Sequence, residues 1–195
     1  DLGIAAQKIY DFAWTEYCDW YIEIVKPRLY GDDVEAKKAA LYTLTYVLET
    51  ILKLLHPYMP FITEEIYTYL PTVEGSIVIA QWPHYKEEDN MASEEEMMEL
   101  AMDGIRNIRN ARAEMDVPPS KKAKVIIVPA EGKKSAVEAT KEYFVTLASA
   151  SMVEIAETEE NIPEDAVSVV INGAKIFIPL DELVDFEKEK ERLTK

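Results

Sequence analysis

The sequence has few of the residues from which reactive or metal-binding sites are usually built. Its 195 residues include one cysteine, two histidines and six glycines, and no two glycines form a G-x-G arrangement. A single thiol excludes a disulfide framework and a cysteine-rich zinc site. The lack of a glycine-rich loop argues against the phosphate cradle of a nucleotide-binding fold. We therefore expect no catalytic residue, no metal and no cofactor in this chain.

Long apolar runs and targeting signals are also missing. No stretch approaches the ~20 apolar residues that a membrane span requires, and the first residues lack a basic-then-apolar leader pattern. The scarcity of cysteine fits a reducing compartment, so we expect a cytoplasmic protein that contacts no membrane. The chain starts without methionine and within a helical pattern, which suggests a piece of a longer protein.

Basic residues are scarce as well. Lys and Arg number 21 against 37 Asp and Glu, which gives a formal net charge of −16. This balance is unfavourable for binding nucleic acid, because phosphate contacts need Lys and Arg. The charge is uneven, however: residues 86–103 hold eight carboxylates and one Lys, whereas residues 104–124 hold six basic and two acidic residues. An acidic surface alone is usual for a soluble protein, so the change of sign is the informative part.

The first part of the chain shows helical periodicity. Apolar residues at three- and four-residue steps predict four helices, at about 5–25, 34–55, 61–70 and 93–114. Lys26-Pro27 is expected to end the first helix, because the residue before a proline is disfavoured in the α region. Asp33 is a candidate N-cap for the second. The fold class is therefore mainly α, as an antiparallel helical bundle with short connections.

The pattern changes after Pro118-Pro119. Segments 124–128, 135–147, 152–156, 167–171 and 175–178 alternate as strand, helix, strand, strand and strand. Asn172-Gly173 between the last two is a strong hairpin signal, so we expect a small β-α-β-β subdomain. A charged helical stretch then predicts the start of a truncated coiled-coil arm. The predicted domains are 1–117 (helical), 118–180 (α/β) and 181–195 (arm).

Nothing in these segments argues for catalysis. His56 and His84 both lie beside prolines at segment ends, without a Ser, Cys or carboxylate at motif spacing, so we expect structural roles for both. Cys18 lies in a helix next to Asp19 and far from any basic cluster, which does not favour a reactive thiolate.

Several longer strings are more specific. They are Phe12-Ala13-Trp14, Tyr17-Cys18-Asp19-Trp20-Tyr21-Ile22-Glu23, Leu55-His56-Pro57-Tyr58-Met59-Pro60-Phe61-Ile62-Thr63-Glu64-Glu65, Gln81-Trp82-Pro83, Ile108-Arg109-Asn110-Ala111-Arg112-Ala113-Glu114, Val117-Pro118-Pro119-Ser120-Lys121 and Ile178-Pro179-Leu180. In this order they resemble the C-terminal, anticodon-binding region of the valine–tRNA ligases, which are class I aminoacyl-tRNA synthetases. The run from Leu55 to Glu65 also occurs in the related isoleucine and leucine ligases, so an equivalent domain of one of those remains an alternative.

The resemblance implies a parent enzyme of protein biosynthesis that attaches valine to its tRNA using ATP. The family's His-Ile-Gly-His and Lys-Met-Ser-Lys-Ser signatures do not occur here, so ATP and Mg²⁺ would belong to a catalytic domain elsewhere in the parent. The first helix of the anticodon-binding domain is also expected upstream. The implied partner is tRNA, specific for valine, with no DNA and with the protein as a monomer.

The resemblance also suggests which residues contact the tRNA. Anticodon bases are unstacked, so proteins read them by aromatic stacking and by hydrogen bonds to their edges. At helical spacing Phe12, Glu16, Trp20 and Glu23 share one face. The resemblance places Glu23 near the anticodon, where its carboxylate can accept from cytosine N4. The open alternatives are that Glu23 pairs with Lys26 or Arg28 on the surface, and that Trp14 and Trp20 are core.

The basic stretch supplies a second set of candidates. Arg106, Arg109 and Arg112 recur every three residues along the predicted fourth helix, and Lys121 and Lys122 follow, with Lys124 two residues on. As phosphate contacts they would make binding salt-dependent. Alternatively they form the solvated face of a helix and pair with nearby carboxylates. An acidic helical module that binds protein therefore remains a second hypothesis for the whole chain.

Overall fold

The computed structural model describes residues 1–118, 120–160 and 162–179, and it divides into two compact units, Asp1–Asp89 and Asn90–Lys195. The predicted coiled-coil arm, 181–195, lies outside the described residues. No helix in the described part of the chain is both long enough and apolar enough to cross a membrane.

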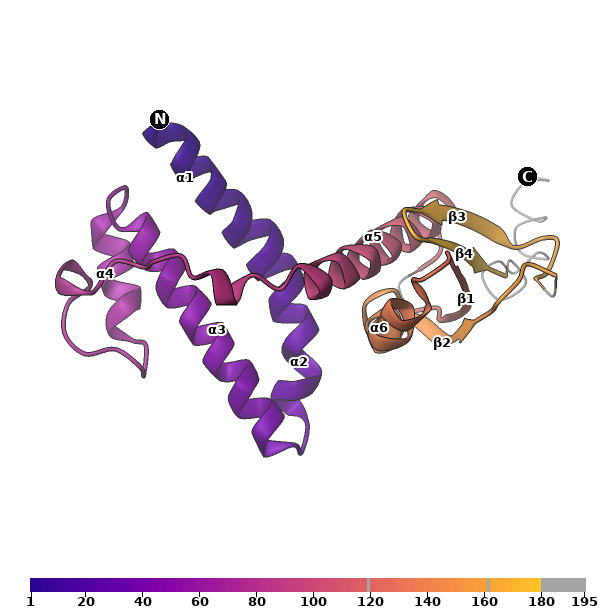
Figure 1. Ribbon diagram of the computed structural model, residues 1–195, viewed down its shortest axis with the longest axis horizontal. Coiled ribbons are helices and arrows are strands. Elements are labelled where there is room, and N and C mark those ends of the chain that lie inside the picture. Colours follow the sequence, from indigo (N-terminus) through magenta and orange to yellow (C-terminus); the bar gives the residue numbers. More distant parts are fainter. Residues whose placement is uncertain (119, 161, 180–195) are drawn as a thin grey trace. The chain divides into compact units, whose positions relative to one another are not determined.

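The first unit begins with three helical segments that follow one another without a break. They are α1 (Leu2–Asp11), η1 (Phe12–Tyr21) and α2 (Ile22–Tyr30). Figure 1 shows α1 and α2 as parts of one rod, which a short loop joins to α3. Through η1 the backbone follows the π-helical pattern, and the amide of Ile22 donates to the carbonyl of Tyr17, five residues earlier. The rod is therefore wider-wound in its middle than an α-helix.

The predicted end of the first helix at Lys26-Pro27 is wrong. Pro27 lies inside α2, and the helix continues to Tyr30 before Gly31 adopts an extended conformation. A proline removes one helical hydrogen bond, but α2 packs on α3, and Leu29, which lies beyond Pro27, is partly buried. Tertiary contact has outweighed the local preference.

Two further helices complete the first unit. Asp33 caps α3 (Val34–Leu55), because its carboxylate accepts from the amides of Glu35 and Ala36 at 3.0 Å each, as expected. After a tight turn, Pro60 is the first residue of α4 (Pro60–Thr68). Two short 3₁₀ turns follow, η2 (Ile77–Ile79) and η3 (Glu87–Asp89).

The core of this unit lies where α3, α4 and η2 meet. Leu52, Tyr67 and Ile77 are buried together there. On the rod, the buried Tyr17 hydroxyl donates to the carbonyl of Leu44 on α3 at 2.9 Å. The Tyr58 hydroxyl donates to the Leu2 carbonyl at 3.0 Å. These contacts hold the rod against the rest of the unit.

The second unit contains the predicted segments as four strands and one helix in the order β-α-β-β-β, one strand more than the predicted β-α-β-β, and a long helix precedes them. Its elements are α5 (Ala92–Glu114), β1 (Ala123–Pro129), α6 (Lys134–Leu147), β2 (Ala150–Ile155), β3 (Val167–Ile171) and β4 (Ala174–Ile178). The strand order is β2-β1-β4-β3. β1 and β2 are parallel and joined through α6, whereas β4 pairs antiparallel with both β1 and β3. The described chain is thus mainly helical with one small mixed sheet.

The predicted hairpin is confirmed. Ile171 pairs with Ala174, so Asn172 and Gly173 alone form the turn between β3 and β4. Gly173 has a φ of 100°, a conformation that favours glycine.

Helix α5 packs against α6 and β3. The contact is close at Gly104: a Cβ atom placed there would lie 2.8 Å from Phe144 Cε1 on α6 and 3.0 Å from Ile176 Cδ1 on β4. Leu100, Ile105 and Ile108 are buried along the same helix. The predicted fourth helix therefore belongs to the compact unit that contains the sheet. The functional assignment of residues 1–117 as one domain stays a prediction.

Candidate nucleic-acid interface

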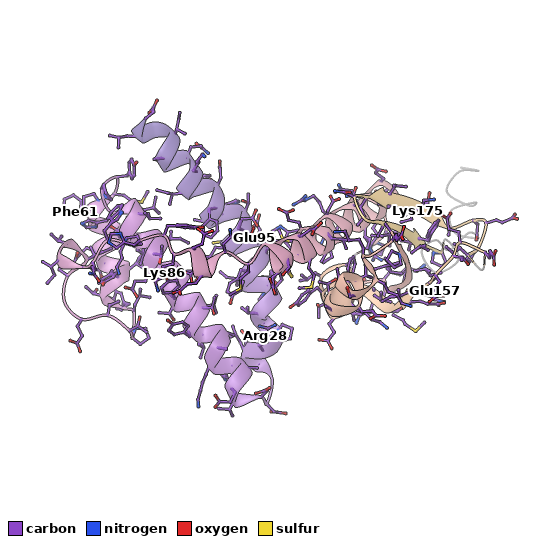
Figure 2. All side chains as sticks on the ribbon, in the orientation of Figure 1. Arg28, Phe61, Lys86, Glu95, Glu157 and Lys175 are labelled. Carbon is purple, nitrogen blue, oxygen red and sulfur yellow. The ribbon has the colours of Figure 1, made fainter. Side chains whose placement is uncertain are left out.

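The helical unit exposes several large aromatic side chains. On the rod, Tyr10 and Trp14 are 57% and 58% exposed, and their rings stack with centroids 6.4 Å apart and planes 3° apart. On α3, Tyr42 and Tyr46 stack in the same way at 6.1 Å. Exposed aromatic faces of this kind can stack with unpaired bases. Phe61, at the start of α4, is also largely exposed and is labelled in Figure 2.

The predicted face formed by Phe12, Glu16, Trp20 and Glu23 is not uniformly accessible. Phe12 is exposed, but Trp20 is only 9% exposed and belongs to the core of the unit. Trp20 thus follows the core alternative, whereas Trp14, with 58% exposure, does not.

Glu23 lies on the first turn of α2 and pairs with Lys26, with Oε1 and Nζ 2.5 Å apart. Both side chains are more than 40% exposed, so the pair contributes little stability. The surface ion pair that the sequence left open is therefore present. Arg28, two residues further along α2, is exposed and labelled in Figure 2. Glu23 and Lys26 thus form a charged pair on α2, and Arg28 adds a further exposed cation to the same helix.

The three arginines of α5 do not share one role. Arg106 and Arg109 are exposed, but the Arg109 Nε donates to the carbonyl of Leu147, the last residue of α6, at 2.8 Å. Arg112 is buried, with 6% exposure, and its guanidinium donates to the carbonyls of Pro118 (3.3 Å) and Lys121. Burial lowers the pKa of Arg112. The row of three arginines that the sequence predicted on one helix face is therefore partly buried.

The three lysines after α5 also differ. Lys121 is partly buried, Lys122 is exposed, and Lys124 pairs with Glu154 on β2 at 2.5 Å. Lys122 is therefore the lysine of this group that is most accessible to a phosphate.

The histidines and the cysteine have ordinary surroundings. His56 Nδ1 lies 2.8 Å from the hydroxyl of the buried Thr63, which in turn donates to the Met59 carbonyl at 2.9 Å. His56 therefore ties the end of α3 to α4, as a structural role predicts. His84 and Cys18 are exposed. The described residues include no group of three or more side chains able to hold a metal.

Stacked aromatics, an exposed carboxylate and scattered cations can contact a flexible polyanion with unpaired bases. The family described as the anticodon-binding domain of tRNA ligase matches residues 1–127 of the chain. The chain belongs to this family.

Three relatives of known name support this membership. The chain is 54% identical over 195 residues to a valine–tRNA ligase of Clostridium perfringens, 52% over 193 to that of Clostridium tetani and 50% over 195 to that of Clostridium acetobutylicum. These alignments cover 99–100% of the chain but 22% of each relative. The chain thus spans about a fifth of the length of these ligases, and the sequence-based resemblance is confirmed.

Two features escaped the sequence reasoning. The stacked pairs Tyr10–Trp14 and Tyr42–Tyr46 carry a four-residue spacing that could have revealed them. The inward orientation of Arg112 had a weaker signal, namely its position just before the end of a helix and the following Pro-Pro. The contribution of Phe12, Glu23, Lys26, Arg28, Arg106, Arg109, Lys121 and Lys122 to binding stays a prediction for this anticodon-binding domain.

Proposed function

We propose that this chain is the part of a valine–tRNA ligase that holds tRNA at its anticodon end and performs no chemistry itself. The observation that carries the proposal is the match to the anticodon-binding family over residues 1–127, together with valine–tRNA ligase relatives at 50–54% identity. The catalytic step, ATP-dependent attachment of valine, is assigned to another domain of the parent enzyme, with its ATP and Mg²⁺.

The proposed mechanism is recognition of unstacked bases. Exposed aromatic side chains of the first unit supply stacking faces. Glu23 supplies a carboxylate that accepts from an exocyclic amino group, such as N4 of the cytosine that ends a valine anticodon. Its existing pair with Lys26 is a weak obstacle, because exposed ion pairs are typically worth no more than about 1 kcal/mol. The lysine and arginine side chains contribute phosphate contacts.

A titration of the chain with valine tRNA across a salt series tests the proposal. We expect measurable affinity at low ionic strength that falls steeply as salt rises, because phosphate contacts release counterions. A tRNA with an altered anticodon should bind more weakly. Affinity that is absent at low salt, or that salt does not change, would contradict RNA binding.

The same titration distinguishes tRNA binding from the competing hypothesis, an acidic protein-binding module. That hypothesis has support from the net charge of −16 and from the internal use of Arg109, Arg112 and Lys124. It predicts no RNA affinity at any salt concentration. Preference for an isoleucine or leucine tRNA would instead assign the chain to a related ligase.

Glu23 is tested by Glu23→Gln in the full-length enzyme. The variant should lose tRNA affinity while the activation of valine by ATP stays unchanged. Glu35→Gln is a control on the same kind of contact, because Glu35 forms an i,i+3 pair with Lys38 at 2.8 Å that is more exposed than the Glu23 pair. An equal loss of valine activation, or an equal effect of the control, would refute the role assigned to Glu23.

A further inference from the structure

The turn between α5 and β1 is held by a buried arginine. Arg112 lies in the last turn of α5, and its Nη2 donates to the carbonyls of both Pro118 and Lys121. The Lys121 amide also donates to the Pro118 carbonyl at 3.0 Å. Three hydrogen bonds therefore close this turn and fasten it to the helix.

The arrangement fixes the backbone of the most accessible lysine in the basic stretch. Lys122 directly follows the clamped turn and directly precedes Ala123, the first residue of β1, which is fully buried. Its neighbour Lys124 is held by Glu154 across the strand pair. Lys122 is exposed, but the chain on both sides of it is fixed.

Fixing a contact residue before binding strengthens the contact, because less conformational freedom remains to be lost. We propose that Arg112 is a positioning residue, which holds the turn so that Lys122 meets a backbone phosphate of the bound RNA. This inference rests on the proposed function. It replaces direct phosphate contact by Arg112, which the burial of its guanidinium does not allow.

The test compares Lys122→Ala, Arg112→Lys and the double variant of the same chain. The readout is the slope of log affinity for valine tRNA against log salt, measured at a temperature where circular dichroism shows every variant folded. This slope is negative, and losing one phosphate contact reduces its magnitude by about 0.7 to 0.9. Arg112→Lys keeps the charge but loses the planar guanidinium that reaches two carbonyls.

We expect each single variant to reduce the magnitude of the slope by that amount. The double variant should reduce it no further. A slope unchanged in Arg112→Lys, or additive losses in the double variant, would overturn the role of Arg112. A wild-type chain that does not bind tRNA even at low salt would overturn the proposed function as well, so the two failures are distinguishable.

Two controls separate positioning from general destabilisation. Gly104→Ala should disturb the contact of α5 with Phe144 without touching the turn, so its slope should equal that of the wild type. Insertion of two glycines between Lys121 and Lys122 leaves Arg112 and its carbonyl partners in place but frees Lys122. It should reduce the magnitude of the slope as Lys122→Ala does. A wild-type slope in this variant would overturn the proposal even if Arg112→Lys did not fold.

Discussion

The close approach of α5 to its neighbours makes Gly104 a sensitive position. A methyl group there would lie 2.8 Å from Phe144 Cε1, 3.0 Å from Phe144 Cζ and 3.0 Å from Ile176 Cδ1. Carbon atoms normally pack at about 3.5 to 4.0 Å. Because Phe144 and Ile176 are completely buried, neither side chain has room to withdraw. We expect Gly104→Ala to destabilise the second unit.

The expected magnitude is a difference between two opposing terms. Overpacking a dense core costs about 1 to 3 kcal/mol, whereas replacing glycine by alanine inside a helix gains about 1 kcal/mol. The net loss should therefore be about 1 kcal/mol, measured as the free energy of unfolding in urea by far-ultraviolet circular dichroism.

The helix-propensity term can be measured at an exposed site of the same helix. Glu99 is exposed on α5, so the difference between Glu99→Ala and Glu99→Gly isolates the propensity and should favour alanine by about 1 kcal/mol. Shrinking the neighbour with Phe144→Leu should remove much of the cost at Gly104. A Gly104→Ala chain that gains stability by as much as the Glu99 pair differs would refute the close-contact argument.

Three other predictions concern single side chains. Burial raises the pKa of Tyr17 to about 12, so the neutral phenol is favoured in the folded state. The stability that this preference contributes should be lost as pH rises from about 10 through 12. The unfolding free energy of Tyr17→Phe, measured in urea across that range, should fall by less than that of the wild type. Thr63→Val leaves the Nδ1 of His56 without its partner and should lower the unfolding free energy by about 1 to 2 kcal/mol, whereas an unchanged value would contradict the structural role of His56. Ser149 follows α6 with a φ of 54°, so Ser149→Gly should raise the thermal midpoint by an amount equivalent to at most about 1 kcal/mol, and a lower midpoint would argue against strain there.

The sequence predicted those elements whose causes are local. Asn172-Gly173 requires a turn conformation that few other residues adopt, and Asp33 supplies the side-chain acceptor that a helix start needs. The continuation of α2 past Pro27 and the assignment of α5 to the unit with the sheet depend on tertiary packing. Spacing alone does not contain that information.

In the candidate interface, too, some features were predictable from the sequence and others depended on folding. The family followed from strings of residues, because such strings are specific. The roles of individual residues did not, since an arginine at helical spacing can face solvent or the interior. Trp20 and Arg112 turned inward for reasons that arise only after folding: Trp20 packs in the core of the first unit, and Arg112 donates to carbonyl groups of the turn that follows α5.

The π-helical segment also fixes the rotation of one end of the rod relative to the other. Because a π-helix pairs residues five apart and an α-helix pairs residues four apart, Phe12–Tyr21 turns the chain through a smaller angle than ten α-helical residues would. If the segment were rewound as an α-helix of the same length, α1 would be rotated relative to α2. The Tyr58 hydroxyl could no longer reach the Leu2 carbonyl while Val25 stayed buried against α3. The winding of η1 therefore sets the rotation of the exposed Tyr10 on α1 relative to the Glu23–Lys26 pair on α2.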